Sequence, residues 1–175
     1  MTYLSPAKIN LFLHITSKRD DGYHNLQTIF QLLDFYDEID FSLRDDGKIN
    51  RISGNEDILI SNDLMIKSAK KLKQYRQTNC GVDIKILKKI PAGGGLGGGS
   101  SNAATTLIAL NKLWNLELTN TELISIGKDI GADVPVFIEG RSAWAEGIGE
   151  ILTPLNLPEY FYLVVSINKQ ISTRE

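Results

Sequence analysis

A dense run of glycines is the most chemically suggestive stretch of this chain. Six glycines lie between residues 93 and 99, and Ser100 and Ser101 follow at once. Because glycine lacks a Cβ, its backbone can approach a ligand closely. A helix that begins directly after such a loop presents N–H groups and the positive end of its dipole to an anion. The stretch therefore predicts a phosphate-binding loop rather than a simple close passage of two backbones.

A dinucleotide-binding loop is the first alternative. Gly93, Gly95 and Gly98 satisfy the pattern G-x-G-x-x-G, and Glu117 follows about 20 residues later. The preceding strand, residues 82–87, alternates polar and apolar residues, whereas a central parallel strand is nearly all apolar. Glu117 also falls between two predicted helices rather than at the end of a strand. These features favour a nucleoside triphosphate over NAD, with a dinucleotide-dependent oxidoreductase as the rival class.

The loop is not of the Walker type. Gly99 stands where that motif places its lysine, after the glycine at 98. Hydroxyl groups at a helix start can bind a phosphate or a Mg²⁺ ion, and the sequence does not choose between Ser100 and Ser101.

A lysine and an asparagine share one side of the first predicted strand. Lys8 and Asn10 lie two residues apart, so their side chains point the same way. The opposite side of residues 7–15 is apolar and is predicted to face the core; it carries Ala7, Ile9, Leu11, Leu13 and Ile15.

The remaining segments predict an α+β or α/β domain. A turn at 19–24 separates the first strand from strands at 26–33 and 38–43, and Asp46-Gly47 predicts a hairpin turn into a strand at 49–52. Helices are expected from residue 62 or 63, from Ser100 or Ser101 to 113, and from Thr119, which has capping-box spacing with Glu122, to 130. The sequences VPVFI, SAWAEG and FYLVVSI look like strands and turns.

Composition narrows the class of protein. The chain has 175 residues, a formal net charge of −2 and one cysteine, Cys80. The balanced charge argues against a nucleic-acid partner. A single cysteine and two histidines argue against a disulfide framework or a zinc site and favour a reducing cytoplasm. No secretory signal or membrane span is expected.

Several motifs resemble one known family. PAGGGLGGGSSNAA resembles the second motif of the GHMP kinases, which include galactokinase, homoserine kinase and mevalonate kinase. SPAKINLFLHITSKRDDGYHNLQTIFQLLDFYDEI, GADVPVF and AEGIGEILTP resemble, in the same order, the members whose substrate is 4-diphosphocytidyl-2-C-methyl-D-erythritol, in the non-mevalonate isoprenoid pathway. The resemblance covers nearly all 175 residues.

The resemblance implies a fold and a domain plan. It implies an α+β domain of the ribosomal protein S5 domain 2-like type, in which a mixed sheet packs against helices. Family members are longer than this chain. Residues 1–165 are therefore expected to be the N-terminal ATP-binding and catalytic domain, and residues 166–175 the start of a connection to a missing C-terminal domain.

The resemblance also implies roles for individual residues. The family transfers the γ-phosphoryl group of ATP, which arrives with Mg²⁺, to a hydroxyl of its substrate, here the 2-hydroxyl. Asp133 would be the general base and Lys8 its partner. The residues that match the ATP-binding positions are Lys88, Pro91, Gly93, Gly94, Gly95, Leu96, Gly97, Gly98, Gly99, Ser100 and Ser101.

The substrate-binding positions that follow from the resemblance are Asn10, Tyr23, His24 and Thr173. Tyr23 would stack on the cytosine ring and His24 would read its edge, while Asn62 and Asp63 match positions near the adenine. A non-catalytic domain that binds nucleotide or substrate without turnover is the other alternative.

Overall fold

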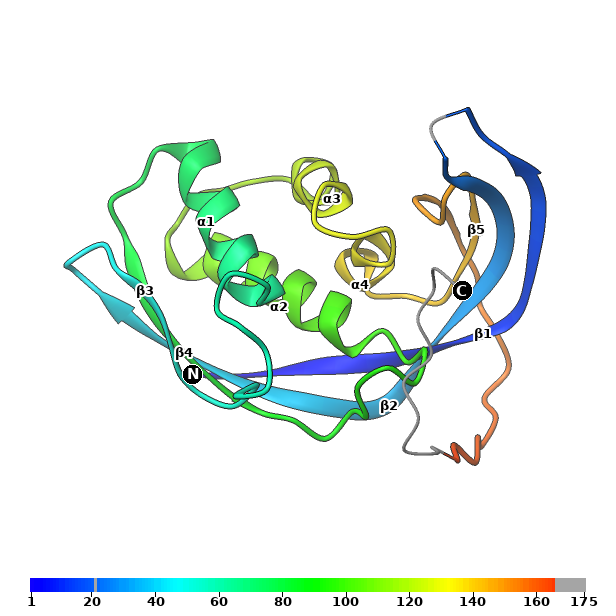
Figure 1. Cartoon of the computed structure of the whole chain (residues 1–175), viewed down its shortest axis with the longest axis horizontal. Coiled ribbons are helices and arrows are strands. Elements are labelled where there is room, and N and C mark those ends of the chain that lie inside the picture. Colours follow the sequence, from blue (N-terminus) through cyan, green and yellow to red (C-terminus); the bar gives the residue numbers. More distant parts are fainter. Residues whose placement is uncertain (21, 166–175) are drawn as a thin grey trace.

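The computed structural model describes residues 1–20 and 22–165, which form one sheet covered on one face by helices (Figure 1). The strands in that part of the chain are β1 (Thr2–Lys18), β2 (His24–Arg44), β3 (Ile49–Ser53), β4 (Gly81–Leu87), β5 (Ala143–Glu146) and β6 (Ile151–Pro154). The helices are α1 (Leu64–Arg76), α2 (Gly98–Leu113), α3 (Asn120–Lys128) and α4 (Val134–Glu139). This arrangement confirms the predicted α+β class with a mixed sheet.

The long strand β2 organises the sheet. The strand order is β3-β4-β2-β5-β6, and β1 pairs with β2 off this path. One end of β2 pairs with β4, as at Phe41 and Ile84, and the other end pairs with β5, as at Ile29 and Trp144. Both pairings are antiparallel, whereas β3 runs parallel to β4. A single strand thus connects the two halves of the domain.

The predicted hairpin at Asp46-Gly47 is wrong. A turn does lie there, and Gly47 has a φ of +72°, but β3 does not pair with β2. Strand β4 lies between them, and α1 connects the parallel strands β3 and β4. An Asp-Gly pair specifies the local turn, whereas the partner of the following strand depends on a segment 33 residues further along the chain, since Ile49 pairs with Val82.

The predicted core face of β1 is also wrong. Leu11, Leu13 and Ile15 are 43%, 50% and 65% exposed. Of the apolar set only Ala7 is fully buried, in a small cluster apart from the main core. Register shifts interrupt the β1–β2 ladder at three places, and each extra residue disturbs the alternation of faces. The outer part of this hairpin also extends past the helices (Figure 1).

The main core lies between the sheet and α2. Helix α2 buries small residues such as Ala103 and Ala104 beside the larger Leu107 and Leu110. Small side chains let a helix approach the sheet closely, so α2 sits centrally with α1 and α4 against it (Figure 1). None of the helices in the described part of the chain is long and apolar enough to cross a lipid bilayer.

Two predicted strands are not strands. VPVFI belongs to α4, which has Pro135 in its first turn and ends at Gly140 in the left-handed conformation. A short apolar run is consistent with either a strand or a buried helix, so its length and pattern did not distinguish them. Residues 161–165 of the FYLVVSI stretch have no regular secondary structure.

The predicted helix boundaries mostly lie within a few residues of the observed ones. Asp63 caps α1, and the capping box of Thr119 and Glu122 is present at α3, where hydrogen bonds from the Thr119 backbone and hydroxyl lower the pKa of Glu122. Helix α3 ends at Lys128 rather than at residue 130. Helix α2 begins at Gly98, with Gly97 at its N-cap, rather than at the predicted serines.

A buried carboxylate joins β2 to the segment that enters the glycine loop. Asp37 is fully buried. Its Oδ1 accepts the backbone N–H groups of Lys89 (2.7 Å) and Ile90 (2.9 Å), and its Oδ2 accepts Asn102 Nδ2 of α2 (2.9 Å) and the Lys88 ammonium. Ion pairing and hydrogen bonding of this kind offset the cost of burying a charge. Asp37 therefore fixes the loop entrance relative to both the sheet and α2.

We expect Asp37→Ala to lower the free energy of unfolding by about 3–5 kcal/mol, because the donors around it would lose a buried partner. The neighbouring Glu38→Ala is the matched control. Glu38 pairs with Lys89 at the surface, where both side chains are more than one third exposed, so its loss should cost at most about 1 kcal/mol. Urea denaturation of both variants measures the difference, and similar losses would contradict the role assigned to Asp37.

Candidate active site

An ammonium and a carboxylate meet beside the glycine loop. Lys8 Nζ of β1 lies 3.4 Å from Asp133 Oδ2, and the two side chains are 6% and 34% exposed. Asp133 occupies the N-cap position of α4, but its side chain makes no capping hydrogen bond. The carboxylate is therefore turned toward Lys8 instead of serving the helix, which is the usual role of an aspartate at such a position.

Three further contacts hold Lys8 in place. Its ammonium donates to Asn10 Oδ1 at 2.7 Å and lies 5.3 Å from the centre of the Phe30 ring. Its backbone N–H donates to the carbonyl of Leu96 at 2.9 Å. Because Leu96 belongs to the glycine loop, the same residue both carries the ammonium and ties β1 to the loop. The predicted pairing of Lys8 and Asn10 on one face is confirmed, and that face lies on the helix side of the sheet.

Gly97 is the point at which the loop approaches this pair. Its φ of +70° is one that residues with a Cβ rarely adopt. A Cβ added there would lie 2.8 Å from Phe137 Cζ and 3.1 Å from Lys8 Cε. Glycine is thus required at residue 97 both by backbone conformation and by the close approach of Lys8.

The start of α2 offers donors for an anion. The first intrahelical hydrogen bond runs from Ser101 N–H to Gly97 O at 2.8 Å, so the N–H groups of residues 98–100 precede the helical ladder. A Cβ added at Gly98 would lie 3.3 Å from Lys88 Nζ, which brings a positive charge to this end of the helix. Amides that precede the helical ladder, a helix dipole and the partly exposed Lys88 ammonium, which also pairs with Asp37, form a donor set that suits a polyphosphate.

The two serines of the loop differ in their surroundings. The Ser101 hydroxyl is fully buried and accepts a hydrogen bond from Ser5 Oγ at 2.8 Å. Its N–H is also used within the helix. Ser100 is partly exposed, and a Cβ added at Gly131 would lie 3.6 Å from its Oγ. We therefore retain Ser100 as a candidate for phosphate or Mg²⁺ and leave out Ser101, whose hydroxyl is buried against Ser5.

Other predicted residues lie away from the Lys8–Asp133 pair. Tyr23 and His24 are exposed at the turn of the β1–β2 hairpin, which curves up on the helix side of the sheet (Figure 1). Thr173 lies outside the described residues. Asp63 caps α1 and pairs with Arg51 at 2.8 Å, so its carboxylate has a structural function.

The predicted loop residues fall into two parts. Gly93, Gly94 and Gly95 form an exposed turn, whereas Leu96 is buried against Ala7 and Ile90. Pro91 lies apart from the pair, in a groove of about 980 Å³ between β2 residues 31–35 and residues 157–164.

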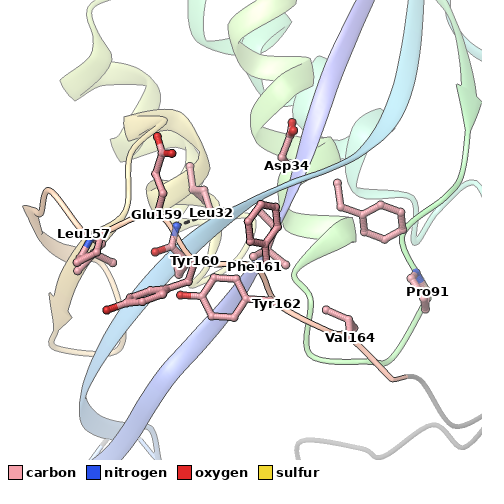
Figure 2. Close-up of a pocket in the computed structure, with 13 residues that line it drawn as sticks. Leu32, Asp34, Pro91, Leu157, Glu159, Tyr160, Phe161, Tyr162 and Val164 are labelled. Carbon is pink, nitrogen blue, oxygen red and sulfur yellow. Dashed lines mark hydrogen bonds between the residues drawn. The ribbon is translucent and has the colours of Figure 1, made fainter.

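Figure 2 shows this groove, with the aromatic rings of Phe161 and Tyr162 beside β2. Residues 157–164 pass on the side of the sheet away from the helices (Figure 1). Its lining contains neither Lys8 nor Asp133. This groove is therefore separate from the place where Lys8 and Asp133 meet.

Sequence reasoning missed the residues that support the site. Asp37 and Asn102 stabilise the loop entrance, and Thr28 bonds to Asn10. All three residues lie within the motifs that carry the family resemblance, but no role was assigned to them there. On its face of the strand, Thr28 lies between Leu26 and Phe30, and a polar residue between two apolar ones was a sign that the sequence offered.

Comparisons with known proteins bear on the family and the fold of this chain. Residues 63–141 match the family model described as "GHMP kinases N terminal domain". The structure of Methanococcus jannaschii mevalonate kinase is 18% identical, has a TM-score of 0.67, and is matched over 89% of this chain and 56% of that chain, which supports the fold. The chain belongs to the GHMP kinase family and carries its N-terminal domain, as its motifs indicated.

More similar relatives share a single name. The 4-diphosphocytidyl-2-C-methyl-D-erythritol kinase of Ruthia magnifica subsp. Calyptogena magnifica is 63% identical over 99% of this chain and 61% of its own length. The protein of that name from Nitrosococcus oceani is 52% identical over 98% of this chain. A crystal structure of 4-(cytidine 5'-diphospho)-2C-methyl-D-erythritol kinase has 37% identity, a TM-score of 0.79, and coverage of 90% of this chain and 56% of that chain. The chain thus spans about 61% of the length of these curated relatives.

Replacing Gly97 should disturb the site more than replacing Gly95. Both residues have a positive φ, of +70° and +71°, so alanine at either position should cost about 1–2 kcal/mol of stability. No atom lies within 4 Å of a Cβ added at Gly95, whereas Gly97→Ala adds a clash with Phe137 and Lys8 worth a further 1–3 kcal/mol or so. Urea unfolding of the two variants tests this difference, and equal losses would contradict the close approach.

Proposed function

We propose that this chain is the ATP-binding and catalytic portion of a kinase that phosphorylates the 2-hydroxyl of 4-diphosphocytidyl-2-C-methyl-D-erythritol in isoprenoid synthesis. The observation that carries the proposal is the 3.4 Å approach of Lys8 Nζ and Asp133 Oδ2 next to the glycine loop. The names of the relatives described above support the choice of substrate. As a small-molecule kinase of isoprenoid synthesis, the protein would act in the cytoplasm.

The glycine loop and the start of α2 would bind the phosphates of ATP. Backbone amides of residues 98–100, the Ser100 hydroxyl and the Lys88 ammonium are the groups that we assign to this role. Mg²⁺ would arrive with ATP and neutralise part of the phosphate charge. Among the described residues, no three His, Cys, Asp or Glu side chains cluster as a metal site, so the nucleotide itself would supply most of the ligands.

Asp133 and Lys8 would act on the acceptor hydroxyl. An alcohol is a poor nucleophile until its proton has an acceptor, and the Asp133 carboxylate would take that proton. The Lys8 ammonium would stabilise negative charge that develops on the attacking oxygen. Phosphoryl transfer proceeds through a loose transition state, so accurate placement of these two groups matters more than the strength of the base. Asn10, Tyr23 and His24 would bind the acceptor substrate.

We expect Asp133→Asn and Lys8→Ala each to reduce turnover at least about 100-fold, the usual size of a general-base contribution. The affinity for ATP should change little, because neither side chain belongs to the proposed phosphate cradle. ADP release in the presence of ATP and the cytidylated methylerythritol measures turnover, and calorimetry with an ATP analogue measures affinity.

Asp129→Asn is the matched control for Asp133→Asn. Asp129 lies four residues earlier, pairs with Lys71 at the surface and is 67% exposed, so turnover should be unchanged. An equal loss of nucleotide affinity in the Asp133 and Lys8 variants would contradict the assignment.

The same assays separate the alternatives. Binding of NAD in preference to ATP would favour a dinucleotide-dependent enzyme. Binding of nucleotide without ADP release by this chain, but with release by a full-length relative, would favour a non-catalytic binding domain.

A further inference from the structure

We infer that Thr28 is a positioning residue that sets the orientation of the Asn10 amide and, through it, the place of the Lys8 ammonium. This inference rests on the proposed function, since Lys8 and Asn10 belong to the proposed site. Thr28 lies on β2 and its side chain is fully buried. It is therefore not exposed to substrate and can influence the reaction only through its neighbours.

A chain of hydrogen bonds connects Thr28 to Lys8. Thr28 Oγ1 donates to the backbone carbonyl of Phe12 at 2.5 Å and accepts Asn10 Nδ2 at 2.8 Å. Asn10 Oδ1 in turn accepts the Lys8 ammonium at 2.7 Å. The ammonium then lies 3.4 Å from Asp133 Oδ2. The series runs without a break from a backbone carbonyl of β1 to the proposed general base.

The direction of each bond in the chain follows from the chemistry of a hydroxyl group. A threonine hydroxyl has one proton, and a carbonyl oxygen can only accept, so the proton of Thr28 goes to Phe12. The remaining lone pairs can only accept, which requires the NH₂ group of Asn10 to face Thr28. The amide oxygen must then face Lys8. In the flipped orientation, NH₂ would face an ammonium, and two donors would meet.

A bulge in β1 makes this arrangement possible. The register of β1 against β2 shifts between Asn10, which pairs with Phe30, and Leu13, which pairs with Thr28. A bulge leaves backbone groups outside the regular ladder, and the carbonyl of Phe12, within this interval, accepts a side-chain donor. The same bulge that disrupts the predicted alternation of faces in β1 thus provides the carbonyl acceptor for the Thr28 hydroxyl.

Thr28→Val removes the hydroxyl with little change in shape, and Thr28→Ser retains it. We expect kcat to fall about 10- to 100-fold in Thr28→Val, since a hydrogen-bonded chain ending at a charge is broken. The KM for ATP should change little because the phosphate cradle is untouched, and Thr28→Ser should recover most of the activity. If Thr28→Val does not fold, Thr28→Ala takes its place.

A double-mutant cycle tests whether Thr28 acts through Asn10. If it does, Thr28→Val should have no further effect on kcat in a protein that already carries Asn10→Ala. Additive losses in the double variant, or equal losses in the valine and serine variants, would overturn the inference.

NMR of the Asn10 side-chain amide separates this inference from the proposed function. Asn10→Ala identifies the resonance, and Thr28→Val should shift it and speed its exchange with water, while Thr28→Ser should leave it nearly unchanged. If the unaltered protein releases no ADP, the proposed function fails, and the NMR result still decides whether Thr28 orients Asn10. An unchanged Asn10 resonance in Thr28→Val would overturn the inference.

Discussion

The buried carboxylate of Asp37 is the constraint on which the site depends. It lies on β2, the strand that pairs with β1, β4 and β5, and both of its oxygens are occupied by donors from the glycine-loop entrance and from α2. A buried charge tolerates little displacement of its partners, because each lost hydrogen bond leaves a desolvated group. The loop entrance, the start of α2 and the sheet are consequently held at fixed relative positions. The exposed glycine turn therefore follows a segment that cannot move easily.

The proposed reaction centre also contains a buried charged group that is held by an ion pair and a hydrogen bond. Lys8 is almost fully buried, and its charge is balanced by the Asp133 carboxylate and the amide oxygen of Asn10. The backbone of Lys8 also binds the glycine loop through Leu96. A phosphate donor in the loop and an acceptor hydroxyl beside Asp133 would therefore be brought together by one residue. Placement of this kind is the main contribution that a protein can make to phosphoryl transfer.

Local sequence signals predicted the features that depend on nearby residues. The capping box at Thr119 and the cap at Asp63 formed where the pattern indicated, and the helix after the glycine loop is present, although it begins at Gly98 rather than at the serines. The features that failed depend on distant partners: the hairpin after Gly47, the apolar face of β1 and the strand expected at VPVFI, which is α4. In each case the local pattern was compatible with two structures, and packing against a remote segment selected one of them.

The sequence alone indicated the family, because the motifs that carry the resemblance consist of particular residue types at short spacings. The phosphate-binding role of the loop was a prediction from its glycines and the helix start, and the pairing of Lys8 with Asp133 was a prediction that followed from that resemblance. The tertiary structure decided that Asp133 faces Lys8 rather than capping α4, that Ser101 is buried, and that Thr28 and Asp37 support the site. These outcomes depend on burial and on hydrogen-bond direction between segments up to 125 residues apart, as Lys8 and Asp133 are. Only the folded chain brings such groups within bonding distance.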